Sequence, residues 1–378
     1  MKIILVGTAY PLRGGIAHFF ALLYHHLRGR HDVEIVTFSR QYPRLLFPGT
    51  SQTEQESESI VVPSLPLIDS LNPLSWVRAA RYIAQQRPAL VVFKYWLPFF
   101  GPCFGMIARL VHRWSQARVV FICDNVIPHE RRPGDRFFTS FAFRAADFFI
   151  VQSKAVEADL RAFRPAARYR LVPHPIYEIF GTPGPKAEAR GRLGISADER
   201  VILFFGYVRP YKGLMTLIDA TAKAIKELSL TLLIVGEFYD DPQKYRRRIQ
   251  DLGLTGAARI YDQYIPTDRV GHFFHACDVV VLPYRSATQS GIVQIAYQFD
   301  KPVIATNVGG LAEVVLDGAT GLVVPADNAA QLAEAIVRFY RDGLEERFVG
   351  NVRTEKRKYS WDAMVEALEE IHNAGTAI

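Results

Sequence analysis

The 378-residue sequence has few cysteines and no long apolar run. Its three cysteines, Cys103, Cys123 and Cys277, show no C-x-x-C spacing, which argues against a disulfide framework or a zinc site. The uncharged stretch at 95–108 contains two prolines and is shorter than the roughly 18–20 residues that span a bilayer. The apolar run at the N-terminus ends at Gly7, too early for a signal peptide. We therefore expect a soluble, cytoplasmic protein.

A basic run with interleaved aromatic residues, typical of nucleic-acid binding, is also missing apart from a short cluster at 246–248. We therefore expect no nucleic-acid partner. The formal net charge is nevertheless +7. This charge fits an anionic small-molecule ligand or a peripheral contact with an anionic membrane, and a generically basic surface is the alternative.

The sequence does contain two sets of buried-strand patterns. Hydrophobic residues make up 49% of the chain, enough for a large core, and the length suggests two domains. Continuous rather than alternating apolar runs indicate parallel strands covered on both faces. The runs lie at 2–7, 32–38, 89–95, 117–123 and 147–152, and then at 201–206, 230–236, 258–262, 278–283, 301–306 and 320–325. The predicted fold class is α/β, with two Rossmann-like, doubly wound domains.

A linker-like segment at 171–190 separates the two sets, because it holds four prolines and two glycines. We predict an N-terminal domain at 1–176 and a C-terminal domain at 177–359. The final segment, 360–378, is expected to form an amphipathic helix that packs back on the first domain. In such sheets ligands bind beyond the carboxyl ends of the strands, so the loops after the strands are the candidate site.

Two of these loops carry groups that suit phosphates. The loop after 2–7 lacks the G-x-G-x-x-G spacing of dinucleotide sites, yet Gly14 and Gly15 at a helix start let a ligand approach the backbone. A plain tight turn is the alternative. Arg209 and Lys212 follow the strand at 201–206, and a planar fork beside a point charge suits a diphosphate. The alternative there is two solvated side chains on a turn.

The loop that precedes the helical pattern at 292–299 contains neither an acid nor a histidine. Thr288 and Gln289 can form hydrogen bonds with sugar hydroxyls. The backbone amides of Gly291 and Ile292, at the start of the helix, favour phosphate oxygens. Ser290 can equally be a helix N-cap with no ligand nearby.

Polar residues also follow the strand at 117–123, namely Asp124, Asn125, His129 and Glu130. Their spacing matches no standard set of metal ligands, so we expect no metal here and favour a polar edge of the site. The aromatic run at 94–104 is either a patch that contacts an acceptor or a membrane, with Arg109, Arg113 and Trp114 behind it, or part of the core.

Taken together, these loops resemble the retaining glycosyltransferases of family 4, which have the GT-B fold. The resemblance is carried by GGLAEVVLDGATGLVVPADNAAQLAEAI at 309–336, FFGYVRPYKG at 204–213 and DVVVLPYR at 278–285. The first half matches more loosely, through Gly14-Gly15 and AADFFIVQSKAV at 145–156. The resemblance implies two domains that face each other across a cleft. It also implies transfer of a sugar, with retention of anomeric configuration, from a nucleoside diphosphate sugar.

The resemblance further implies roles for individual residues. Arg209 and Lys212 would bind the diphosphate and act in catalysis, together with Asp124 and His129 on the acceptor side. The donor would be held by Gly14, Gly15, Gly236, Glu237, Tyr264, Ile265, Thr288, Gln289, Ser290, Gly291 and Ile292. Within that set, 14–15 would contact the phosphates or the sugar, 291–292 phosphate, 288–290 the sugar, and 236–237 and 264–265 the base. The nucleotide sugar would be a substrate, with no cofactor and no metal. A lipid-linked or polysaccharide acceptor would place the protein in cell-envelope polysaccharide biosynthesis, at the inner face of the membrane.

Three departures from the family pattern are visible. Tyr207 stands where the family commonly has an arginine, and Arg209 follows two residues later. Thr288 and Ala296 occupy the positions of the family's paired glutamates. Asp124, or Cys123 in a register shifted by one residue, stands where the family often has a histidine. These departures leave open a catalytically inactive nucleotide-binding subunit, or an epimerase that would use Asp124, His129 or Glu237 for proton transfer.

Overall fold

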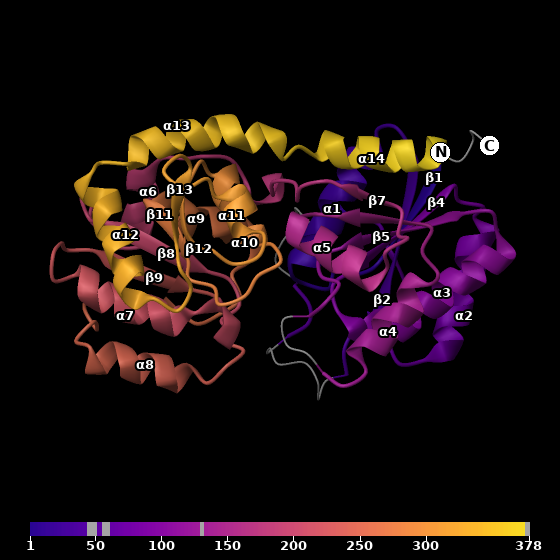
Figure 1. The fold of residues 1–378 in the computed structure, drawn as a ribbon, viewed down its shortest axis with the longest axis horizontal. Coiled ribbons are helices and arrows are strands. Elements are labelled where there is room, and N and C mark those ends of the chain that lie inside the picture. The colour runs from indigo at the N-terminus through magenta and orange to yellow at the C-terminus, as the bar shows by residue number, and fades with distance from the viewer. Residues whose placement is uncertain (44–50, 55–60, 129–131, 375–378) are drawn as a thin grey trace. The chain divides into compact units, whose positions relative to one another are not determined.

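The computed structural model describes residues 1–43, 51–54, 61–128 and 132–374. The chain divides into two compact units, Met1–Pro175 with Ser360–Ile378, and Ile176–Tyr359 (Figure 1). This boundary lies one residue before the predicted one. Each unit is built on one parallel sheet, which confirms the predicted fold class. Among the residues described, no helix is both long and apolar enough to cross a membrane.

In the first unit, strands and helices alternate along the chain from β3 onwards, and no helix is described between β2 and β3. Its elements are β1 (Lys2–Val6), α1 (Gly15–Leu27), β2 (Asp32–Arg40), β3 (Leu65–Asp69), α2 (Pro73–Gln85), β4 (Leu90–Tyr95), α3 (Gly101–Trp114), β5 (Arg118–Cys123), α4 (Asp135–Phe143), β6 (Phe148–Val151), α5 (Lys154–Phe163), β7 (Tyr169–Leu171) and α14 (Trp361–Asn373). The strands pair in parallel in the order β3-β2-β1-β4-β5-β6-β7. The direction of winding reverses between β1 and β4, so the loops after these strands diverge and leave room for a ligand.

The second unit repeats this plan. Its elements are α6 (Lys186–Arg192), β8 (Val201–Phe205), α7 (Leu214–Ala224), β9 (Thr231–Val235), α8 (Pro242–Asp251), β10 (Ala258–Tyr261), α9 (Val270–Ala276), β11 (Val279–Leu282), α10 (Gly291–Gln298), β12 (Val303–Thr306), α11 (Leu311–Val314), β13 (Gly321–Val324), α12 (Ala329–Arg341) and α13 (Glu345–Glu355). The parallel order is β10-β9-β8-β11-β12-β13, with the reversal between β8 and β11.

Two strands escaped the sequence analysis, and both are at the edge of the first sheet. β3 contains Pro66, and β7 has three residues, of which two are exposed. An edge strand is covered on fewer sides than a central one, so it lacks the continuous apolar run that marked the others.

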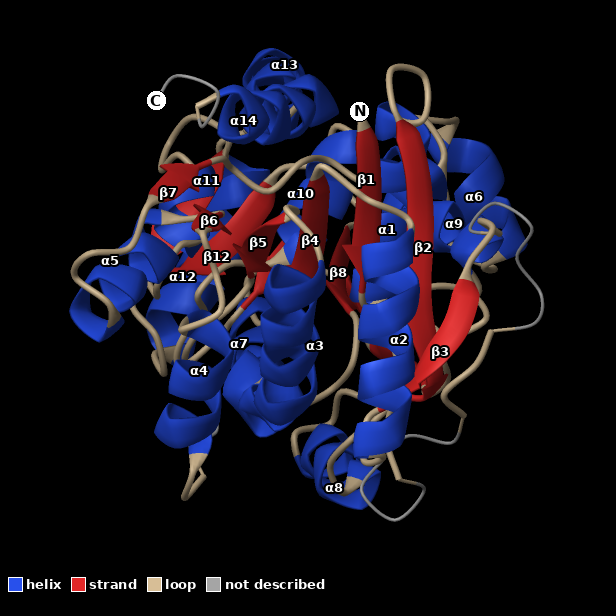
Figure 2. Cartoon of the chain, turned by 90° about the vertical axis from the view of Figure 1, so that its right-hand side faces the viewer, coloured by secondary structure: helices blue, strands red, loops and turns tan. Residues whose placement is uncertain are grey.

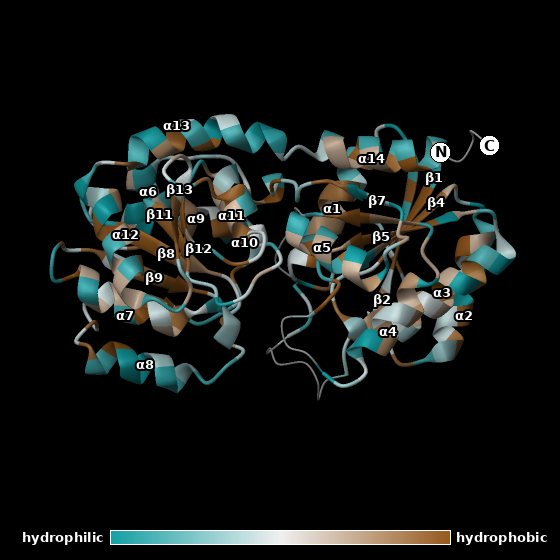
Figure 3. Ribbon diagram, in the orientation of Figure 1, coloured by the Kyte–Doolittle hydropathy of each residue, from teal (hydrophilic) through white to brown (hydrophobic). Residues whose placement is uncertain are grey.

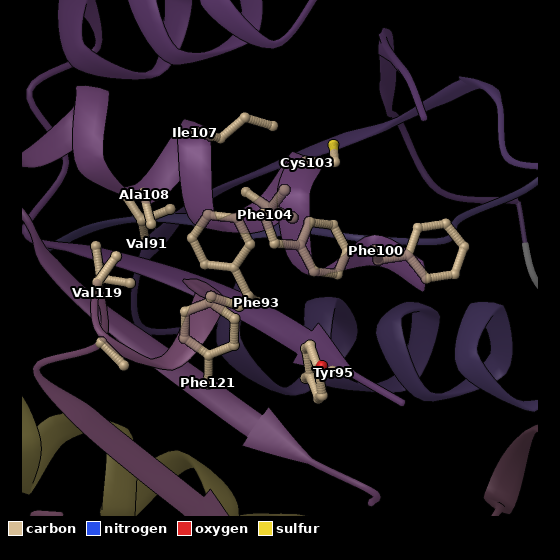
Figure 4. Close-up of a cluster of buried hydrophobic side chains, with 14 of the residues drawn as sticks. Val91, Phe93, Tyr95, Phe100, Cys103, Phe104, Ile107, Ala108, Val119 and Phe121 are labelled. Carbon is tan, nitrogen blue, oxygen red and sulfur yellow. The ribbon is translucent and has the colours of Figure 1, made fainter. Parts of the chain in front are cut away.

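The aromatic run at 94–104 belongs to the core of the first unit rather than to its surface. Tyr95, Phe100 and Phe104 are fully buried, and Phe104 packs against Phe93 with ring centroids 5.3 Å apart (Figure 4). The Tyr95 hydroxyl donates to Thr139 Oγ1 at 2.9 Å, which satisfies the polar end of a buried ring. Figure 3 shows the same division in each unit, with hydrophobic strands inside and hydrophilic helices such as α8 and α13 outside.

The C-terminal helix α14 packs on the first unit, as predicted. The Trp361 ring stacks on His26 of α1 with centroids 5.5 Å apart. Arg118, at the start of β5, donates from Nη1 to the carbonyl oxygens of Ile371 and His372 at 2.6 and 2.7 Å. These hydrogen bonds satisfy carbonyls that the end of a helix leaves without a partner.

Candidate functional site

The loop after β8 carries the buried cation Lys212. The chain leaves β8 at Gly206 with φ of +101°, makes a short 3-10 turn at Pro210–Lys212 and enters α7. A Cβ atom added to Gly206 would lie 3.1 Å from Lys212 Nζ and 3.3 Å from Ile292 Cδ1. Glycine at 206 therefore allows the left-handed backbone and keeps the space beside the ammonium group open.

Lys212 is placed unfavourably for its own charge. Its side chain is buried, with 8% of the residue exposed. Burial, followed by repulsion from Arg209, lowers the pKa of Lys212 from 10.5 to about 7. The Tyr284 ring lies 5.7 Å from Nζ, and Lys212 Nζ forms no hydrogen bond or ion pair with any residue that the structure describes. A buried charge is costly unless an opposite charge is paired with it, and an anion bound beside Lys212 Nζ would supply that pairing.

Arg209 is held over an aromatic stack. Its guanidinium carbon lies 5.1 Å from the centre of the Tyr239 ring, within cation–π range. Tyr239 stacks on Tyr207 with centroids 4.6 Å apart, and Tyr207 in turn faces Tyr264 at 6.5 Å. Tyr207 is thus part of the support for the arginine that comes two residues later.

The loops after β8 and β9 are joined through their backbones. The Val208 amide donates to the Glu237 carbonyl at 2.9 Å, and the Tyr239 amide donates to the Val208 carbonyl at 3.0 Å. Gly236 has φ of +139°, and a Cβ there would fall 2.3 Å from the Gly206 carbonyl oxygen, so only glycine fits this crossing. The second unit therefore brings four of the predicted donor residues close to the stacked tyrosines Tyr207, Tyr239 and Tyr264, namely Gly236, Glu237, Tyr264 and Ile265. Glu237 and Ile265 are buried.

The start of α10 offers one amide for a ligand rather than two. Ser290 caps the helix, because the Ile292 amide donates to Ser290 Oγ at 3.3 Å. The Gly291 amide donates to no acceptor among the described residues. A Cβ on Gly291 would lie 3.1 Å from the Tyr177 ring, so the helix start packs closely there. Ser290 thus acts as the N-cap that the sequence left open, and the predicted phosphate contact from Ile292 competes with that cap.

Thr288 and Ala296, which the resemblance aligns with a pair of glutamates, are both buried. The Thr288 carbonyl accepts a hydrogen bond from the Gly310 amide at 3.1 Å, which joins the loop before α10 to the glycine pair at 309–310. Gln289 is half-buried beside it. Ala296 lies in the interior, where it is fully covered. The sequence analysis missed Gln294 of α10, whose side-chain oxygen is buried without a donor among the described residues. A glutamine inside an apolar helical pattern was the available signal.

In the first unit, Asp124 is the partner of a buried lysine. Asp124 Oδ1 lies 2.6 Å from Lys94 Nζ, and their side chains are 14% and 1% exposed. Lys94 Nζ also donates to Gln152 Oε1 at 2.7 Å and lies 3.6 Å from the centre of the Phe19 ring. Burial lowers the pKa of Lys94, although Asp124 acts in the opposite direction. Lys94 was not among the predicted site residues. A lysine inside an apolar strand pattern is the feature of the sequence that could have indicated it.

The remaining predicted residues of the first unit are Gly14, Gly15 and His129. α1 begins at Gly15, and Gly14 precedes it with φ of +109° and no side-chain cap, so this is a helix start as predicted. It follows β1 as Asp124 follows β5, and parallel strands end at the same edge of their sheet. His129 and its neighbour Glu130 lie outside the described residues. Within the described ranges, no cluster of three or more His, Cys, Asp or Glu residues could hold a metal ion.

Sequence families match both halves of the chain. The family described as "Glycosyl transferase 4-like domain" matches residues 14–175, and "Glycosyl transferases group 1" matches residues 199–342. D-inositol 3-phosphate glycosyltransferase from Acidothermus cellulolyticus is 28% identical over 284 residues, which cover 72% of this chain and 62% of that protein. The enzyme of the same name from Actinosynnema mirum is 31% identical over 236 residues, which are 58% of this chain and 55% of that protein. The match thus spans about three fifths of these relatives.

Solved structures resemble the chain over its whole length. Sucrose-phosphate synthase from Thermosynechococcus elongatus superposes with a TM-score of 0.76 at 22% identity, and covers 100% of both chains. The Anabaena protein HepE, solved in complex with UDP, superposes with a TM-score of 0.77 at 18% identity and the same coverage. At these identities the likeness concerns the fold, which is GT-B.

Proposed function

Since this chain belongs to the group 1 glycosyltransferases, which have the GT-B fold, we propose that it transfers a sugar from a nucleoside diphosphate sugar to an acceptor, with retention of anomeric configuration. The observation that carries the proposal is Lys212, a buried ammonium group without a counter-ion among the described residues. A diphosphate beside Gly206 would supply the missing anion. Arg209, held by Tyr239, and the Gly291 amide would bind the remaining phosphate oxygens.

The other parts of the donor have candidate contacts in the same unit. The base would lie against the backbone at 236–237 and 264–265, beside the stacked tyrosines. The sugar would contact Thr288, Gln289 and Ser290. UDP-sugars are the first donors to test, because HepE has been solved with UDP-glucose.

The chemistry we propose needs no protein nucleophile. The bond between the anomeric carbon and the β-phosphate oxygen breaks, and a bond from the acceptor oxygen forms on the same face of the sugar. The acceptor's proton moves to an oxygen of the leaving diphosphate. Lys212 and Arg209 stabilise the charge that develops on that diphosphate, which is electrostatic catalysis by preorganised groups. Because these two side chains supply positive charge, we propose that the reaction uses neither a cofactor nor a metal.

The acceptor would be bound by the first unit, at the edge that carries Asp124. The ion pair with Lys94 holds the Asp124 carboxylate in place, and its partly exposed oxygens can accept a hydrogen bond from an acceptor hydroxyl. His129 is proposed as a second group on this side. We further propose that the acceptor is lipid-linked or a polysaccharide, met at the cytoplasmic face of a membrane.

A second candidate function is nucleotide binding without transfer. In its favour, the resemblance aligns Thr288 and Ala296 with the family's two glutamates, and Ala296 is fully buried. The two functions differ in turnover. Release of nucleoside diphosphate from a panel of donor sugars supports the transferase, whereas tight binding without transfer or hydrolysis supports the binding subunit.

The phosphate assignment is tested by comparing UDP with UMP in a thermal-shift titration. Stabilisation by a ligand grows with its concentration relative to its dissociation constant. If Lys212 contacts the β-phosphate, UDP binds the wild type much more tightly than UMP does, and Lys212→Met removes most of that difference. Lys223→Met is the matched control, since Lys223 is an exposed lysine of α7 in the same unit. An unchanged preference for UDP in Lys212→Met would refute the assignment.

A further inference from the structure

A long stretch of the first unit contains no acidic residue. From Ser70 to Cys123 there is no Asp or Glu, although the chain has 38 acids in 378 residues and 54 residues would on average hold about five. The same stretch contains six arginines and one lysine. The arginines therefore give this stretch a high density of positive charge, whereas Lys94 is neutralised by its ion pair with Asp124.

This stretch forms α2 and α3 and the strands between and after them. α2, α3 and α4 lie side by side in one layer that covers the first sheet (Figure 2). Each of these helices follows a parallel strand, namely β3, β4 and β5. Their N-terminal ends therefore lie at the carboxyl edge of the sheet, the edge that carries Asp124 and Gly14.

Large apolar side chains are exposed at that edge, beside arginines. Leu74 of α2 is 67% exposed and Phe137 of α4 is 69% exposed. Leu71, just before α2, and Val77 are exposed as well. Arg78 and Arg81 project from the exposed side of α2, and neither makes an ion pair with a described residue. We call Leu71, Leu74, Val77, Arg78 and Arg81 the α2 face.

We propose that the α2 face, together with Phe137, binds the surface of a bilayer that contains anionic phospholipids. Exposed leucine and phenylalanine side chains gain free energy by entering the boundary between headgroups and acyl chains. Arginines alongside them are attracted to anionic headgroups, and the lack of acids from 70 to 123 leaves α2 without an opposing repulsion, whereas Asp135 in the first turn of α4 adds one negative charge near Phe137. Because Tyr95, Phe100 and Phe104 of the aromatic run at 94–104 are buried, we place the contact on α2 and α4 instead.

The proposal deepens the proposed function, and it rests on that function for the nature of the acceptor. A membrane bound at the carboxyl edge of the first sheet would bring a lipid-linked acceptor next to Asp124. The protein would then meet its acceptor by diffusion along the bilayer rather than by extracting a lipid into water.

The test is sedimentation of the full chain with vesicles of phosphatidylcholine, with and without phosphatidylglycerol. We expect binding only to the anionic vesicles, weakened by salt. Arg78→Gln with Arg81→Gln should weaken binding about thirtyfold, from about 1 kcal/mol per arginine near an anionic surface and about 1.36 kcal/mol per factor of ten. Leu74→Ser with Phe137→Ser should weaken it at least about tenfold.

Matched controls come from other surfaces of the chain. Trp114→Ser removes an exposed aromatic residue at the C-terminal end of α3, away from the proposed contact. Arg338→Gln with Arg341→Gln removes two exposed arginines of α12 that have the same spacing as Arg78 and Arg81. Both controls should bind vesicles as the wild type does.

Three results would overturn the proposal: no binding to anionic vesicles, equal loss of binding in the controls, or a wild-type dimer that Leu74→Ser dissociates. The last result would make the α2 face an interface between two copies of the chain. UDP binding by the same variants is measured in parallel. Vesicle binding without UDP binding would contradict the proposed function alone, and UDP binding without vesicle binding would contradict the membrane surface alone.

Discussion

Nucleotide binding should take up a proton at alkaline pH, because Lys212 is buried. In the free protein its pKa is about 7, compared with an ordinary value of 10.5. A diphosphate against the ammonium group favours the charged form and raises the pKa towards its ordinary range. At pH 8 only about one tenth of the free protein is protonated at Lys212, whereas nearly all of the complex is. Uptake should therefore approach about 0.9 proton per nucleotide bound.

Isothermal titration calorimetry with UDP at pH 8, in two buffers that differ in ionisation enthalpy, measures this uptake. The terminal phosphate has a second pKa of about 6, so at pH 8 it is already ionised and contributes little of its own. The same linkage makes the affinity for UDP fall above pH 7, by up to about tenfold per pH unit.

The lysine is identified by comparing two variants. Lys212→Met should take up almost no proton and bind UDP about thirtyfold to a thousandfold more weakly, from about 2–4 kcal/mol for one charge-stabilising donor. Lys223→Met should behave as the wild type does. The reasoning is refuted if the wild type takes up no proton at pH 8, or if Lys212→Met takes up as many protons as the wild type.

Three further predictions concern stability and the support of Arg209. Between pH 7 and about 10.5, Lys212 is protonated in the unfolded protein but has lost its proton in the folded protein. The free energy of unfolding of the wild type should therefore rise with pH relative to that of Lys212→Met. The same pH dependence of urea unfolding in the two proteins would contradict this. Lys94→Met removes the ion pair with Asp124 and should lower the free energy of unfolding by about 3–5 kcal/mol, and Asp124→Asn added to it should restore part of the loss. An unchanged urea midpoint would show that the pair does not stabilise the fold. Tyr239→Leu should weaken UDP binding about threefold to fivefold through loss of the cation–π contact, whereas Tyr239→Phe should not. Equal affinities of Tyr239→Leu and the wild type for UDP in calorimetry would show that Arg209 does not need Tyr239 to bind the nucleotide.

The sequence was sufficient for the central strands and for the start of α1, because each leaves a local pattern. A continuous apolar run indicates a strand or a helix that is buried on both sides. Gly14 and Gly15 stand directly before a helical repeat of apolar residues. Edge strands such as β3 leave a weaker pattern, since fewer of their side chains face the core.

Contacts between distant loops could not be predicted in this way. The ion pair of Lys94 with Asp124 depends on β4 and β5 being neighbours in the sheet. The stack of Tyr207 on Tyr239 depends on the backbone link between the loops after β8 and β9. The aromatic run at 94–104 has a composition that suits both a core and a surface patch, so only the packing around Phe100 and Phe104 distinguishes them.

Contacts of the loop before α10 could not be predicted from the sequence either. The resemblance aligns Thr288 and Ala296 with two glutamates of the family pattern, but the sequence does not show that Ala296 is buried. Ser290 was open to two interpretations until its hydrogen bond to the Ile292 amide identified it as the helix cap.

The central claim is that Lys212 stabilises the diphosphate of a sugar donor during transfer. It is tested most directly by incubating the wild type and Lys212→Met with a panel of nucleoside diphosphate sugars and measuring the nucleoside diphosphate released. The account predicts that the wild type turns over at least one donor, by transfer or by slow hydrolysis. It also predicts that Lys212→Met is slower by about thirtyfold or more on that donor. Equal turnover by the two proteins, or a wild type that binds donors and turns over none, would contradict it.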